Sequence, residues 1–144
     1  MPLPGVMVDN DGQGSHVDHP NANPVRVSSP QEIAAFFRGL GKHVVSFAGF
    51  GELGYEEKGV VPRIAREVLA PWPPGRVIVC CGTLLRVGGE SGIAAVYEVA
   101  RALGMETAGI HPSVALGFAE THRLSPFCDR AHWVHDDTWG VTRD

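Results

Sequence analysis

Hydrophobic and polar positions along this chain follow two periods, one typical of buried strands and one typical of helices. Apolar runs predict strands at residues 43–48, 77–81 and 107–111, with a fourth at residues 131–135. Apolar residues recur at helical spacing in residues 61–69 and 92–103, and a short helix is expected from residue 30. This alternation indicates βαβ units. We expect a three-layer, Rossmann-like α/β fold with a mostly parallel sheet of four or five strands and helices on both faces.

The ordered domain is predicted to begin near residue 28. Ser29, Pro30 and Glu32 form a capping-box signature with proline at the first helical position. Residues 1–27 carry Pro, Gly, Asn, Asp and His with little apolar periodicity, so we interpret them as a flexible N-terminal tail. Residues 28–144 are expected to form a single domain, in which residues 119–126 form a loop or a short helix.

Glycines follow two of the predicted strands. The first cluster has the spelling G-x-G-x-x-G, and the second precedes the helix at residues 92–103. At such a junction, free backbone N–H groups and the positive end of the helix dipole favour an anion. The sequence therefore predicts a phosphate-binding site formed by Gly49, Gly51, Gly54, Gly82, Thr83, Gly88, Gly89, Glu90, Ser91 and Gly92.

Two features argue against a dinucleotide site at the first cluster. The helix after it shows its apolar face only from residue 61, and the strand at residues 77–81 ends without an acid for a ribose hydroxyl. The alternative to a phosphate-binding role for the first cluster is a tight turn, which needs the backbone angles of glycine and binds no ligand.

Composition and charge limit the classes of partner and the compartment that we expect for this protein. A formal net charge of -4 argues against a nucleic-acid backbone as the main partner. Two of the three cysteines are adjacent in a strand, which favours reduced thiols in the cytoplasm. Neither a membrane-spanning apolar segment nor a signal-peptide pattern is recognisable, so we expect a cytoplasmic protein that does not contact a membrane. A small sheet leaves an open edge, and we expect a homo-oligomer.

Three acids are candidates for chemistry. Asp136 and Asp137 follow the last predicted strand and could form a metal or ribose site, although adjacent acids are more often turn formers. Glu98 lies within the helix at residues 92–103 and is either a catalytic acid or a solvent-facing charge. His132 and His135 fall on opposite faces of a strand, so we predict no metal site, and no cofactor is predicted.

Residues 44–69 and 77–112 resemble the LOG-like Rossmannoid superfamily, often described as the "lysine decarboxylase family". The resemblance is carried by the first strand, glycine loop and helix, by the GG-x-x-G cluster at residues 88–92, and by the Gly-x-x-Pro ending at residues 109–112. The best-known members are cytokinin-nucleotide phosphoribohydrolases. Their second motif, PGG-x-GT-x-x-E, supplies the catalytic glutamate, and this sequence has Asp136-Asp137-Thr138-Trp139-Gly140 in the equivalent place.

The resemblance therefore implies a ligand site without the usual catalytic glutamate. We expect binding of a nucleotide or other phosphorylated small molecule by a non-hydrolytic sensor or carrier. One alternative is a nucleotide N-glycosidase in which Glu98, Asp136 or Asp137 replaces the missing glutamate. Another is a structural or interaction subunit.

Overall fold

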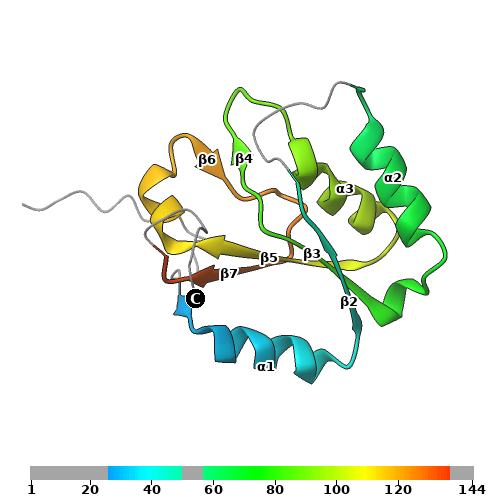
Figure 1. Cartoon of the computed structure of the whole chain (residues 1–144), viewed down its shortest axis with the longest axis horizontal. Helices are drawn as coiled ribbons and strands as arrows, with labels where there is room; N and C mark the ends of the chain where they lie inside the picture. Colours follow the sequence, from blue (N-terminus) through cyan, green and yellow to red (C-terminus); the bar gives the residue numbers. More distant parts are fainter. Residues whose placement is uncertain (1–25, 50–56, 137–144) are drawn as a thin grey trace, which may run out of the picture.

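A five-stranded parallel sheet forms the centre of the computed structural model, which describes residues 26–49 and 57–136 (Figure 1). Every neighbouring pair of strands is parallel, and their order across the sheet is β1-β7-β5-β3-β2. The strands are β1 (Val27–Ser28), β2 (His43–Phe47), β3 (Val77–Cys81), β5 (Glu106–Pro112) and β7 (Arg130–Val134). The predicted fold class and sheet are confirmed. The boundary expected after residue 27 falls inside β1.

The helices lie on both faces of this sheet. From β2 the chain moves across the sheet to β3, β5 and β7 in turn, whereas helix α1 (Pro30–Leu40) connects β1 at one edge to β2 at the other. Right-handed crossovers in opposite directions place their helices on opposite faces. Helices α2 (Val60–Leu69) and α3 (Ala95–Ala102) therefore share one face and α1 covers the other, which completes the three layers (Figure 1).

Helix α1 begins as its sequence predicts and ends at a glycine. Glu32 N donates to Ser29 Oγ and Ser29 N donates to the Glu32 carboxylate, so the predicted capping box is confirmed. The N-cap bond satisfies one of the helix's free amides, and the negative Glu32 is favourable at the positive end of the helix dipole. At the other end, Gly41 adopts the left-handed conformation that commonly terminates helices.

The main core lies between β3 and the helix pair α2 and α3. All five residues of β3 are buried, as expected for an interior strand of a parallel sheet that is covered on both faces. Small residues on the helices, including Ala65 and Ala100, are fully buried and allow close packing. Tyr97 is also fully buried in this core, and its hydroxyl donates to the carbonyl oxygen of Cys81 at 2.6 Å.

No α-helix forms between β5 and β7. The chain instead forms the 3-10 helix η3 (Ser113–Phe118) and the short strand β6 (His122–Arg123), which pairs antiparallel with β4 (Leu85–Arg86). A second small core forms here from Leu84, Ala115 and Trp133. Residues 119–126, expected to be a loop or a short helix, therefore contribute a strand. None of the helices within the described ranges is long and apolar enough to cross a membrane.

Candidate functional site

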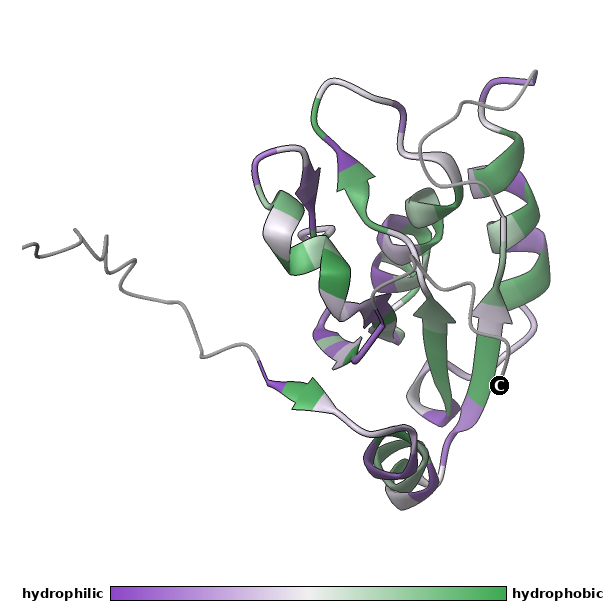
Figure 2. Ribbon diagram, turned by 60° about the vertical axis from the view of Figure 1, so that its left-hand side comes forward, coloured by the Kyte–Doolittle hydropathy of each residue, from purple (hydrophilic) through white to green (hydrophobic). Residues whose placement is uncertain are grey.

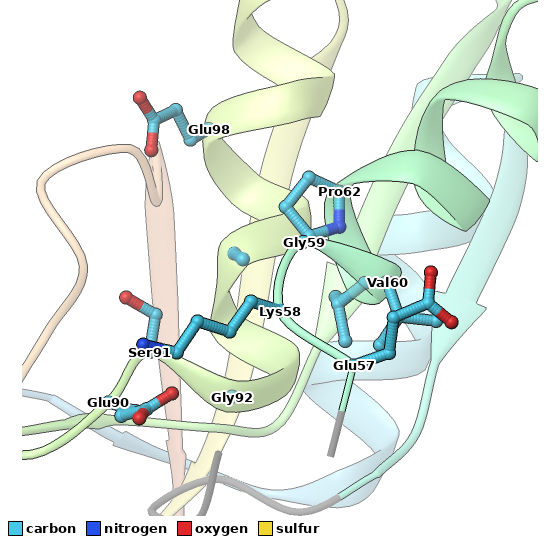
Figure 3. Close-up of a pocket in the computed structure, with 11 residues that line it drawn as sticks. Glu57, Lys58, Gly59, Val60, Pro62, Glu90, Ser91, Gly92 and Glu98 are labelled. Atoms are coloured by element: carbon cyan, nitrogen blue, oxygen red, sulfur yellow. The ribbon is translucent and has the colours of Figure 1, made fainter. Parts of the chain in front are cut away.

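A pocket of about 440 Å³ lies between the beginning of α2 and the turn that leads into α3 (Figure 3). Three of the residues predicted from the second glycine cluster, Glu90, Ser91 and Gly92, line this pocket. The rest of the lining comes from the start of α2, the residues before it and helix α3: Glu57, Lys58, Gly59, Val60, Val61, Pro62, Ala95 and Glu98. The pocket therefore combines one predicted glycine turn with the start of a helix.

The start of α2 has no side-chain cap. Gly59 holds the N-cap position in the left-handed conformation (φ 78°), and no side chain caps the helix there. In the first turn, Val60 N already donates to Glu57 O at 3.3 Å and Pro62 has no N–H, so Val61 supplies the remaining amide. This amide and the helix dipole favour a negative group at the mouth of the pocket.

The turn before α3 offers a smaller set of donors than expected. Gly89 N donates to Arg86 O at 3.0 Å, with Gly88 in the left-handed conformation (φ 76°), so the Gly89 amide is already used. The helix then starts as a 3-10 turn, η2 (Gly92–Ala94), and the Ser91 hydroxyl makes no capping bond to it. Ser91 thus occupies the N-cap position without a side-chain cap, and its place in the phosphate-binding site stays a prediction.

Charge around the pocket is mixed. The described lining contributes three carboxylates, from Glu57, Glu90 and Glu98, and one ammonium group, from Lys58. Glu57 already pairs with Arg63 at 3.0 Å. In Figure 3 the Lys58 side chain extends toward Ser91 and Glu90, while Glu98 projects from α3 at a distance from them. The positive end of the pocket is therefore at Lys58 and the α2 terminus, and Glu98 marks a separate acidic end.

The other predicted ligand residues that the structure describes do not line this pocket. Gly82 and Thr83 follow β3, and the Gly82 carbonyl faces the ring of His111 at 3.3 Å from Nδ1. A Cβ at Gly82 would lie 3.2 Å from Ile110 O, so this glycine allows close contact between two strand ends. Gly49 follows β2. The predictions for Gly51 and Gly54 lie outside the described residues.

The candidate catalytic acids are separated by the fold. Glu98 is exposed and lines the pocket. Asp136 is buried, with its backbone N–H donating to Ser113 Oγ at 3.1 Å and its carbonyl accepting from Val114 N at 3.1 Å. Asp137 lies outside the described residues. The structure therefore brings only Glu98, of the two described candidates, to the ligand site.

Sequence reasoning missed the segment formed by Glu57, Lys58 and Gly59. These residues lie between the first glycine cluster and the apolar face of α2, where no motif includes them. A signal was present nonetheless, because Gly59 directly precedes a helix that has no Ser, Thr, Asp or Asn at its start.

A buried histidine lies beside the ends of β3 and β5. His111 is 1 % exposed, and its Nε2 has no hydrogen-bond partner among the described residues. Burial is the main cause that lowers the pKa of His111 from 6.5 to about 4. Because a carbonyl oxygen only accepts, Nδ1 carries the proton in the bond to Gly82. His111 is therefore a neutral structural residue at physiological pH.

Two of the three cysteines are poor nucleophiles because their thiols stay protonated. Burial raises the pKa of both Cys80 and Cys128 to about 11, which keeps these groups protonated. Within residues 26–49 and 57–136, no group of three or more His, Cys, Asp or Glu side chains is arranged to hold a metal ion.

Comparisons with protein-family models, with curated proteins and with solved structures gave no match to this chain.

Proposed function

We propose that the chain binds a phosphorylated small molecule, such as a nucleotide, in the pocket between α2 and the Glu90–Gly92 turn. The observation that carries this proposal is the start of α2, which no side chain caps and which opens beside Lys58 and Ser91. Backbone amides, a lysine and a hydroxyl are common ligands of phosphate. The phosphate would occupy this positive end of the pocket.

The acidic end of the pocket restricts the rest of the ligand. A phosphate placed close to Glu98 would be repelled, so this carboxylate is expected to face uncharged donor groups. Sugar hydroxyls donate hydrogen bonds to carboxylates and suit that position. A phosphorylated sugar or nucleotide therefore fits the distribution of charge better than a ligand with two anionic ends.

Binding can be tested by thermal shift and calorimetry with nucleoside monophosphates, the matching nucleosides and inorganic phosphate. We expect a monophosphate to stabilise the protein, by about 2.7 kcal/mol at a concentration one hundred times its dissociation constant. Replacing Lys58 with glutamine should weaken binding more than about tenfold, because an ionic contact to phosphate is lost.

The matched control for Lys58→Gln is Lys42→Gln. Lys42 lies just before β2, at the opposite end of the strands, where it pairs with Glu106 at 2.9 Å. This control should bind as the unmodified protein does. If none of the phosphorylated compounds stabilises the chain, or if the Lys58 variant binds normally, the proposal is wrong, and a structural or interaction subunit becomes the better hypothesis.

A second candidate function is hydrolysis of a nucleotide N-glycosidic bond. It is favoured by one observation, the presence of Glu98 on the wall of the same pocket. Incubation with nucleoside monophosphates should then release free base and ribose 5-phosphate, and Glu98→Gln should abolish the release. Binding without release by the unmodified protein would favour the sensor or carrier and rule out the hydrolase for the compounds tested.

A further inference from the structure

An ion pair joins the wall of the ligand pocket to the exposed side of helix α2. The helix carries both apolar and polar residues, which alternate along its ribbon (Figure 2). Arg63 belongs to its polar side and does not line the pocket, but its Nη2 donates to the carboxylate of Glu57 at 3.0 Å. Glu57 does line the pocket. Arg63 is therefore connected to the proposed ligand site through this carboxylate.

The side chains of the adjacent residues Glu57 and Lys58 point in different directions. In Figure 3 the Lys58 side chain extends toward Ser91, whereas the Glu57 carboxylate points away from both. The Glu57 side chain is 66 % exposed, so packing does little to fix its position, and the bond to Arg63 is the contact that orients it. Without that bond, the carboxylate would be free to turn toward the ammonium group of Lys58.

We infer that Arg63 is a positioning residue of the phosphate site, which holds the Glu57 carboxylate away from Lys58 and balances its charge. This inference rests on the proposed function, because it requires that an anion binds beside Lys58. An unpaired Glu57 would compete with the phosphate for Lys58 and would also repel the phosphate directly. Arg63 thus raises the affinity for an anion that it does not contact.

The dimensions of the pocket make this charge effective, and its exposure limits the effect. A cube of 440 Å³ has an edge of about 8 Å, which is close to the Debye length at physiological ionic strength. Salt therefore screens a carboxylate on the wall only partly from an anion inside the pocket. Arg63 and Glu57 are both more than half exposed, so water weakens the interaction, and we expect a change in affinity of about three- to fivefold.

The test is calorimetric titration with adenosine monophosphate and with inorganic phosphate. Arg63→Gln should raise the dissociation constant about three- to fivefold. Glu57→Gln should not raise it, and the double variant Arg63→Gln/Glu57→Gln should bind within about 1.5-fold of the unmodified chain, because the interfering carboxylate is gone. Arg63→Lys keeps the positive charge and should bind as the unmodified chain does.

Rescue by the second substitution separates this role from a purely structural one. If the ion pair only stiffened the segment before α2, Arg63→Gln, Glu57→Gln and the double variant would all lose affinity equally, and the inference would be wrong. The matched control is Arg66→Gln, which removes a positive charge from the last turn of α2 and should leave the affinity unchanged. Circular dichroism of each variant monitors folding.

The remaining outcomes distinguish this inference from the proposed function. Normal binding by Arg63→Gln, or an equal loss for Arg63→Gln and Arg66→Gln, would overturn the role of Arg63 and leave the phosphate site in place. Failure of the unmodified chain to bind either compound would count against the phosphate site itself, and the role of Arg63 would be refuted with it.

Discussion

The neutral, buried His111 predicts a specific loss of stability in mild acid. Burial lowers its pKa from 6.5 to about 4 in the folded chain, so the unfolded chain binds a proton first as the pH falls. The contribution of neutral His111 to the free energy of unfolding is complete above about pH 6.5 and is lost progressively as the pH falls toward 4. The difference of 2.5 units, from 6.5 − 4, corresponds to about 3.4 kcal/mol at 1.36 kcal/mol per unit.

The measurable part of this effect lies between pH 7 and pH 5. Over that interval the linkage relation gives a loss of about 1.8 kcal/mol from His111 alone. His111→Asn removes the titrating ring and keeps an N–H that can donate to Gly82 O in place of Nδ1. Urea unfolding at the two pH values should therefore show a smaller loss of stability for this variant than for the unmodified chain.

The comparison needs two controls. His132, whose pKa is also lowered by burial and by Arg130, remains in both proteins and cancels in the difference. His43→Asn makes the same substitution at an exposed histidine, beside Trp72, and is the control for the change of residue type. Equal losses for His111→Asn and the unmodified chain would refute the reasoning, because the histidine would then titrate normally in the folded state.

Two further predictions concern stability at neutral pH. Gly109→Ala should cost about 1–3 kcal/mol in denaturant unfolding, because a Cβ there would overlap the His111 ring and lie 2.7 Å from the Tyr97 hydroxyl. The control is Gly39→Ala, inside α1, where an added Cβ would have no atom within 4 Å. This variant should be more stable by about 0.5–1 kcal/mol. Equal destabilisation by Gly39→Ala and Gly109→Ala would contradict the packing explanation. Ser29→Ala should cost about 1 kcal/mol through loss of the α1 cap, and unchanged thermal unfolding would contradict it.

The sequence by itself determined most of the regular elements. The apolar run at residues 77–81 became the fully buried β3, and the Ser29 and Glu32 signature became the capping box of α1. These predictions are confirmed because strand burial and helix capping depend on residues within a few positions of one another. The glycine cluster before α3 was identified for the same reason, although the bond from Gly89 to Arg86 was not.

Only the tertiary structure decided which residues share the pocket. Glu57, Lys58 and Gly59 lie more than thirty positions before Glu90, Ser91 and Gly92, and the packing of α2 beside α3 brings the two segments together. The same is true of Gly109, which must be glycine because His111 and Tyr97 occupy the space a side chain would need. Contacts of this kind depend on how elements pack across the sheet, and no local pattern in a single sequence encodes that arrangement.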